Sequence, residues 1–211
     1  MIRILVADDH PTVRRGVVHL LRETFKTAQF GEVATAPETL EKVRQEKWDL
    51  LILDIGLPGR GGLDVLHELK RAKEAPPVII HSIYPEEQFA VRAIKAGAAG
   101  YLTKESAPEE LVHAVRQVLG GGRYISGSLA DKLAVELAAG TSRPPHELLS
   151  DREFTVLRLL ASGNTPTQIA QELSLSVKTV STYRARILEK TGMRSTAELI
   201  RYALEHKLTE H

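Results

Sequence analysis

The first 119 residues alternate short apolar runs with stretches in which apolar side chains recur every three or four positions. Short apolar runs bounded by polar residues indicate buried strands, and the longer period indicates helices with one buried face. Strands are expected at about 2–7, 32–35, 50–53, 78–82 and 100–104, the second being the weakest, each followed by a helix. Five such units predict a parallel sheet with helices on both faces, a flavodoxin-like α/β fold.

Strand signals end near residue 120. Residues 120–147 begin with three glycines, hold one amphipathic stretch near 129–137 and end in a proline-containing turn, which indicates a linker with a short helix. Residues 148–211 show only the helical period, with helices expected at about 151–162, 166–173, 177–191 and 196–206. The chain therefore divides into an α/β domain at 1–119, a linker at 120–147 and an all-α domain at 148–211.

Three of the expected helices begin with a capping-box pattern. In this pattern a serine side chain and a glutamate three residues later each accept from the other's backbone N–H. The three are Ser106-x-x-Glu109, Ser150-x-x-Glu153 and Ser195-x-x-Glu198. They mark the expected starts of the last α/β helix and of the first and last helices of the all-α domain.

The amino-acid composition further limits the class of protein and the kinds of site that the chain can contain. Hydrophobic residues make up 43% and charged residues 26%, which is ordinary globular usage. The absence of cysteine excludes disulfides and thiolate metal sites. No apolar run approaches the roughly 20 residues that span a bilayer, so we expect a cytoplasmic protein without membrane contact.

Polar residues stop the apolar runs at one edge of the expected sheet. They are Asp8, Asp9, Asp54, Ser82 and Lys104. Ligands of open parallel sheets bind at this edge, and a cluster of carboxylates there suits Mg²⁺. With metal and Lys104 neutralising charge, Asp54 can act as a nucleophile and form an acyl phosphate, to which Ser82 can donate a hydrogen bond. Each residue alone is more simply a surface group, but the five together favour a phosphorylation site.

The all-α domain contains a second signal, between residues 168 and 188. Its apolar positions describe two helices joined by the tight turn Ser174-Leu175-Ser176, which indicates a helix-turn-helix. The alternative is an α-hairpin that only packs on the other domain. Residues 176–190 carry Lys178, Arg184, Arg186 and Lys190 against the single acid Glu189. This local basic excess suits contact with DNA phosphates.

The polar residues at the edge of the expected sheet also match the pattern of a known protein family. Residues 1–119, with Asp8-Asp9, the Asp54-x-x-Leu-Pro-Gly loop, Ser82, Tyr101 and Lys104, resemble a receiver domain of two-component signalling. The resemblance implies phosphorylation of Asp54, with Mg²⁺ bound by Asp9, Asp54 and the Gly56 carbonyl, by Asp8 through water, and with Lys104 at the phosphoryl group. It also implies that Ser82 and Tyr101 form a switch pair. Glu105 stands where that family often has proline, which leaves the isomer of the Lys104–Glu105 bond open.

Residues 149–208 resemble the LuxR-type helix-turn-helix, on Gln168-Ile-Ala-Gln-Glu-Leu173 and Ser176-Val-Lys-Thr-Val-Ser-Thr-Tyr183. Paired with a receiver, this is the architecture of NarL/FixJ-type response regulators. The resemblance implies DNA contacts from Lys178, Ser181, Thr182 and Ala185 at bases, and from Arg184, Arg186 and Lys190 nearer phosphates. Thr179 is a further expected DNA-contact residue. Leu199, Ile200 and Ala203 of the last helix would form a dimer contact, or else close the domain core.

The sequence thus predicts a transcription regulator and not an enzyme. The catalysis expected of it is limited to its own phosphoryl transfer and slow autodephosphorylation. Its implied partners are a sensor histidine kinase, double-stranded DNA, a second copy of the chain when phosphorylated and, as a further candidate, RNA polymerase. A Mg²⁺-dependent phosphatase is disfavoured because no general acid follows Asp8 or Asp54 by two positions. The remaining alternatives are a phosphorylation-independent DNA-binding regulator with a scaffold receiver, and an interaction module without DNA.

Overall fold

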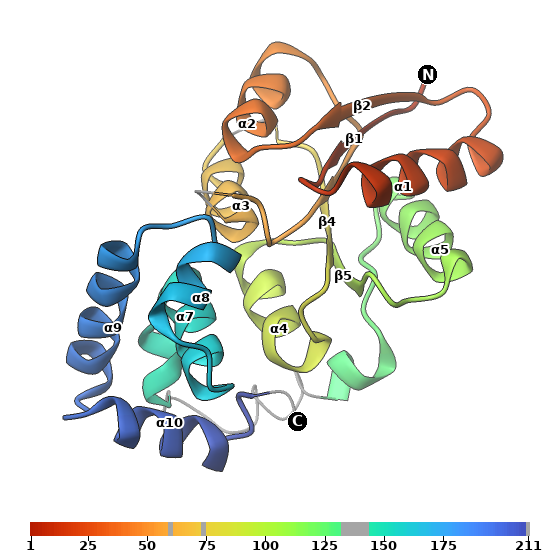
Figure 1. Ribbon diagram of the computed structural model, residues 1–211. Coiled ribbons are helices and arrows are strands. Elements are labelled where there is room, and N and C mark those ends of the chain that lie inside the picture. The colour runs from red at the N-terminus through yellow and green to blue at the C-terminus, as the bar shows by residue number, and fades with distance from the viewer. Residues whose placement is uncertain (59–60, 73–74, 132–143, 210–211) are drawn as a thin grey trace. The chain divides into compact units, whose positions relative to one another are not determined.

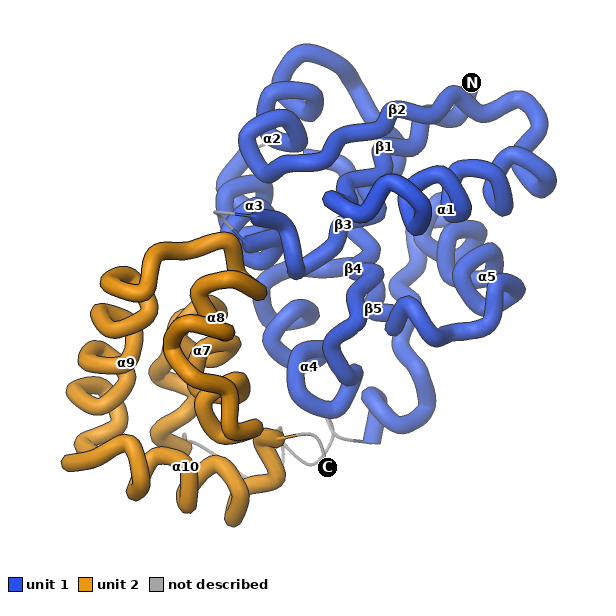
Figure 2. Tube along the Cα trace, viewed as in Figure 1, with its two compact units in different colours: residues 1–138 blue, residues 139–211 orange. Residues whose placement is uncertain are grey.

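The computed structural model describes residues 1–58, 61–72, 75–131 and 144–209. The chain forms two compact units, residues 1–138 and 139–211 (Figure 2), and the division falls inside the segment predicted as a linker. Of the short helix expected near 129–137, residues 127–131 are helical and the remainder lies outside the described residues.

The N-terminal unit is the predicted five-stranded parallel sheet with helices on both faces (Figure 1). Its strands lie in the order β2-β1-β3-β4-β5. They are β1 (Arg3–Ala7), β2 (Gln29–Val33), β3 (Leu50–Leu53), β4 (Val78–Ser82) and β5 (Gly100–Thr103). The helices are α1 (Pro11–Thr24), α2 (Ala36–Gln45), α3 (Gly62–Lys70), α4 (Glu86–Ala96) and α5 (Pro108–Leu119). Helices α1 and α5 pack together on one face, and α2, α3 and α4 lie on the other.

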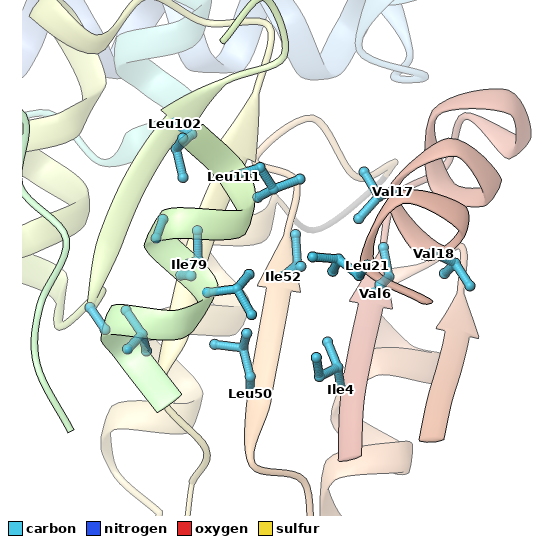
Figure 3. Packing of buried hydrophobic residues seen from close by; sticks show 14 residues of the cluster. Ile4, Val6, Val17, Val18, Leu21, Leu50, Ile52, Ile79, Leu102 and Leu111 are labelled. Atoms are coloured by element: carbon cyan, nitrogen blue, oxygen red, sulfur yellow. The ribbon is translucent and has the colours of Figure 1, made fainter. Parts of the chain in front are cut away.

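The central strand β3 is apolar along its whole length because both faces of the sheet are covered. Leu50 and Ile52 of β3 belong to the cluster under α1 and α5, together with Leu21 and Leu111 (Figure 3). The alternate residues of β3 are equally buried and point to the other layer. This double burial ends abruptly at the carboxyl edge, where the polar residues begin.

Two local predictions in this unit were wrong. Strand β2 covers Gln29–Val33 and not 32–35, because an edge strand that is half exposed lacks the apolar run that marks the others. Helix α5 begins at Pro108 with no side-chain cap, so Ser106-x-x-Glu109 is not a capping box. Ser106 Oγ lies 3.2 Å from Thr103 Oγ1 instead, and the fixed φ of proline starts the helix.

The C-terminal unit contains the four predicted helices after a short 3₁₀ turn, η1 (Pro145–Leu148). They are α7 (Asp151–Ala161), α8 (Pro166–Glu172), α9 (Val177–Thr191) and α10 (Thr196–Glu205). The Ser150 capping box is confirmed. Ser195 caps α10, but the Glu198 carboxylate accepts from the backbone N–H of Arg194 rather than completing the box. In the described part of the chain, no helix has the length and apolarity to cross a membrane.

Candidate functional site

The backbone of the sheet fixes the polar residues at its carboxyl edge. Asp54 follows β3, and its N–H donates to Ala7 O at 2.9 Å. Lys104 follows β5, and its N–H donates to Ser82 O at 2.8 Å. These ladder-like bonds extend the strand pairing by one residue. The side chains that sequence reasoning placed at this edge are therefore held together by strand geometry.

Lys104 joins two buried carboxylates. Its Nζ lies 2.7 Å from Asp8 Oδ2 and 2.7 Å from Asp54 Oδ2. The side chains of Asp54 and Lys104 are only 2% and 8% exposed, so little water screens the interaction. Burial alone would lower the pKa of Lys104, but the adjacent Asp54 and Asp8 outweigh it and raise that pKa above its ordinary value. The lysine therefore stays charged beside the candidate phospho-acceptor.

The acidic residues form a cluster that could hold a cation. One ligand atom each from Asp8, Asp9, His10 and Asp54 lie within 4.8 Å of one another. Asp9 Oδ1 is buried and accepts no hydrogen bond from the described residues, although His10 Nδ1 is 2.9 Å away. An unsatisfied carboxylate oxygen beside two others is a fit for a hard cation such as Mg²⁺. Gly56 lies at the same place, since its N–H donates to Asp54 Oδ1 at 3.0 Å.

The structure adds two histidines that the sequence reasoning did not select. His10 joins the acidic cluster, and its only sequence signal is its position directly after Asp8-Asp9. His81 is buried in β4 next to Ser82, where desolvation, and next the positive charge of Lys104, lowers its pKa to about 4. It is therefore neutral at physiological pH. Its sequence signal is a titratable residue inside an apolar strand.

The expected switch residues Ser82 and Tyr101 are both buried and both contact the same loop residue. Ser82 Oγ accepts from Tyr84 N–H at 3.4 Å, and the Tyr101 hydroxyl donates to Tyr84 O at 2.7 Å. The Tyr101 ring thus lies inside the domain in this structure. The Lys104–Glu105 bond, whose isomer the sequence leaves open, is trans.

The C-terminal unit presents α9 as an exposed, positively charged helix. Val180 and Ile187 anchor its inner face in the domain core. The predicted DNA-contact residues on the outer face are exposed, namely Lys178, Ser181, Thr182, Arg184, Ala185, Arg186 and Lys190. Thr179 is half-buried, and its hydroxyl lies 2.8 Å from Ser176 Oγ in the N-terminal cap. The face of α9 that was predicted to contact DNA is therefore exposed.

Lys190 has a partner inside its own domain. Its Nζ lies 2.6 Å from Oε2 of Glu153, a carboxylate that is almost fully enclosed by protein. Burial alone would raise the pKa of Glu153, but hydrogen bonds from Lys190 and Ser150 outweigh it and lower that pKa below its ordinary value. The predicted role of Lys190 at DNA phosphates therefore competes with a structural one.

We expect Lys190→Met to destabilise the C-terminal domain by about 1 kcal/mol near neutral pH, a modest value because the lysine is half exposed. A lowered folded-state pKa means that Glu153 stabilises the domain above its ordinary pKa and loses this contribution as the pH falls through the folded value. The difference between wild type and Lys190→Met should therefore shrink below about pH 4.5. Thermal unfolding from pH 3 to 7 measures this, with Lys178→Met as the matched control. Equal pH profiles for all three proteins would contradict the structural role.

The predicted dimer contact on α10 requires correction. Leu199 and Ala203 are fully buried within the C-terminal unit, and only Ile200 is half exposed. Leu199 and Ala203 lie one helical turn apart on the inner face of α10 and belong to the core of the domain. The alternative reading, in which these residues close the core, holds for Leu199 and Ala203.

Comparison with known families matches both units. Residues 4–116 match the model of the response regulator receiver domain, and residues 147–203 match that of bacterial regulatory proteins of the luxR family. The chain is 36% identical over 211 residues to the response regulator GacA of Pseudomonas viridiflava, covering all of this chain and 99% of that protein. It is 32% identical over 209 residues to the response regulator UvrY of Escherichia coli K12, covering 99% and 96%.

Comparison with solved structures also finds response regulators. A LuxR-family two-component response regulator from Aurantimonas is 35% identical with a TM-score of 0.59, covering 64% of this chain and 97% of that one. RcsB of Salmonella enterica serovar Typhimurium, bound to the rprA promoter in the presence of the phosphomimetic BeF₃⁻, is 25% identical with a TM-score of 0.62. That likeness covers 96% of this chain and 98% of RcsB.

Proposed function

This chain belongs to the two-component response regulators of the NarL/FixJ type, with a receiver domain and a LuxR-type helix-turn-helix domain, and from that premise we propose a specific switch. A sensor histidine kinase phosphorylates Asp54, and phosphorylation controls pairing of two copies and their sequence-specific binding to double-stranded DNA. The observation that carries the proposal is the buried Lys104 ammonium held between Asp8 and Asp54.

The chemistry at Asp54 follows from this arrangement. A carboxylate oxygen of Asp54 attacks phosphorus, an acyl phosphate bond forms, and the bond to the donor's histidine nitrogen breaks, so that the electron pair leaves with the imidazole. Bound Mg²⁺ would neutralise charge on the phosphoryl oxygens, and Asp8, Asp9, Asp54 and Gly56 would hold it. Lys104 then contacts a phosphoryl oxygen, and the Ser82 hydroxyl donates to another.

The DNA half of the proposal rests on α9. Its outer face is exposed and basic, and one α-helix fits the major groove. A two-fold pair of domains would read two half-sites about one helical turn, or a multiple of it, apart. The likeness to RcsB, solved on promoter DNA, supports this use of the domain.

The alternative of a phosphorylation-independent DNA binder with a scaffold receiver keeps α9 but predicts a degraded pocket. Asp8, Asp54 and Lys104 instead make direct contacts, and Ser82 is buried next to them in the ladder. The intact pocket favours the switch.

The DNA-binding role of α9 is testable on the double-stranded operator. We expect Lys178→Ala to weaken specific binding by about 1–3 kcal/mol, roughly 5- to 150-fold, because a lost base contact costs that much. Arg201→Ala, which removes an exposed cation from α10, is the matched control and should bind within about twofold of wild type. Fluorescence-anisotropy titrations at fixed salt measure both. Equal losses in the two variants would mean that only general charge matters and would exclude base contact by Lys178.

A further inference from the structure

The segment that follows α5 is attached to the edge of the receiver sheet. Tyr124 N–H donates to Ala99 O at 2.8 Å, and Tyr124 pairs with Gly100 in a parallel bridge beyond β5. A Cβ on Gly100 would lie 3.1 Å from Tyr124 Cβ, so the glycine permits this close approach. The Tyr124 hydroxyl also bonds the Glu110 carboxylate of α5. The first residues of the linker are thus a built part of the receiver domain (Figure 1).

Two serines of this segment converge on one carboxylate. Ser126 Oγ and Ser128 Oγ both donate to Oε1 of Glu86, the latter at 2.7 Å. Ser126 also caps the helical turn that follows, since its Oγ accepts from Leu129 N–H at 3.1 Å. Leu129 itself is fully buried. We call Glu86, Ser126 and Ser128 the serine clasp.

The serine clasp is joined to the phosphorylation pocket by a very short path. Glu86 is the first residue of α4, and only residues 83–85 separate it from Ser82. The loop is held at Tyr84, whose carbonyl accepts from Tyr101 and whose ring stacks on Phe89 of α4 with centroids 4.8 Å apart. Ser82, Tyr101 and the serine clasp therefore all fix the position of one loop.

We propose that the serine clasp is the element that couples the phosphorylation state of Asp54 to the start of the interdomain linker. The proposal rests on the proposed function, because it takes Ser82 as the group that responds to the phosphoryl oxygen. When Ser82 bonds that oxygen, the loop is stabilised in the position seen here, with Tyr101 inside. Glu86 is then held where both serines reach it, and the helical turn after Ser126 is ordered.

Thermodynamic linkage requires that the coupling between Asp54 and the serine clasp acts in both directions. If phosphorylation closes the serine clasp by some factor, a closed clasp must favour the phosphorylated state by the same factor. Breaking the clasp should therefore weaken binding of a phosphoryl analogue at Asp54, although no clasp residue touches the pocket. A purely structural contact would not have this consequence.

The test is hydrogen–deuterium exchange of the peptide covering residues 124–131 in the full-length chain, with and without beryllofluoride and Mg²⁺. In wild type we expect the analogue to slow exchange of this peptide about fivefold, within the usual range of coupling between sites. Glu86→Ala removes both hydrogen bonds of the serine clasp, whereas Ser128→Ala removes one and leaves the Ser126 bond and the Ser126 cap in place. In Glu86→Ala exchange should be fast and independent of the analogue, and beryllofluoride affinity should fall by the same factor. Ser128→Ala should show smaller changes in the same directions.

Glu109→Ala is the matched control, because it removes an exposed carboxylate from the first turn of α5, outside the serine clasp. It should behave as wild type. If the analogue protects the segment equally in wild type, Glu86→Ala and Ser128→Ala, the clasp is not the coupling element, and the proposed function is unaffected. Faster exchange in wild type on adding the analogue would also overturn the proposal. A wild-type protein that binds no beryllofluoride would overturn both the clasp and the proposed role of Asp54.

Discussion

Replacing Lys104 with methionine is expected to lower the free energy of unfolding of the receiver domain by about 3 kcal/mol in Mg²⁺-free buffer, the size typical of breaking a buried ion pair. The ammonium lies 2.7 Å from a carboxylate oxygen of both Asp8 and Asp54, and all three side chains are almost fully buried. Without it, two carboxylates face each other with no compensating charge. Methionine keeps the length of the side chain, so the loss reports charge and not volume.

Magnesium should reverse much of this loss. A cation bound among Asp8, Asp9 and Asp54 supplies the missing positive charge, so Mg²⁺ should stabilise Lys104→Met more than it stabilises wild type. Urea unfolding with and without Mg²⁺ measures both effects. Lys26→Met, which removes an exposed lysine just after α1, is the control and should change stability by less than about 0.5 kcal/mol. An unfolding free energy of Lys104→Met equal to that of the control would show that the bridge contributes nothing to stability.

Gly62→Ala is expected to destabilise the receiver domain by about 3 kcal/mol, because it overpacks a site with no free space. A Cβ at this position would lie 2.0 Å from the backbone oxygen of Asp54 and 2.9 Å from Ile55 Cα. Both contacts are with backbone, so no side-chain rotation relieves them. The first turn of α3 would have to move away from the end of β3, displacing Asp54 and reducing phosphorylation as well as stability.

Gly16→Ala is expected to have the opposite effect on the stability of the same domain. Gly16 lies in α1, and apart from its chain neighbours and the nearby backbone of its own helix, no atom lies within 4 Å of a Cβ built there. Alanine should therefore stabilise the domain by about 0.5–1 kcal/mol through helix propensity. Urea denaturation of the two variants distinguishes lost space from a general effect of replacing glycine. The account of α3 is wrong if both substitutions stabilise.

The sequence was sufficient for the features that arise from strand ends. Asp54 and Lys104 could be placed together because a parallel sheet brings the carboxyl ends of its strands to one edge. The helix α9 could also be predicted from the sequence, since its apolar positions repeat with the helical period. In both cases a local pattern determines a spatial relation.

Other features depend on contacts that no local pattern encodes. The pair of Lys190 and Glu153 joins residues 37 positions apart, so Lys190 could be assigned only to the exposed face of its own helix. Leu199 and Ala203 satisfied the pattern of an apolar patch, but that pattern is the same whether the patch meets a second chain or the domain's own core. The serine clasp lies between segments about 40 residues apart, and its serines look like ordinary linker residues.

In the proposed switch, phosphorylation of Asp54 controls DNA binding. The most direct test is a fluorescence-anisotropy titration of the operator with wild type and Asp54→Ala, each with and without acetyl phosphate and Mg²⁺ at fixed salt. We expect the phosphodonor to tighten DNA binding by wild type about tenfold, a coupling of about 1.4 kcal/mol, and to leave binding by Asp54→Ala unchanged. Equal affinity of both proteins in all conditions would contradict the switch, leave α9 as a DNA reader, and reduce the receiver domain to a scaffold.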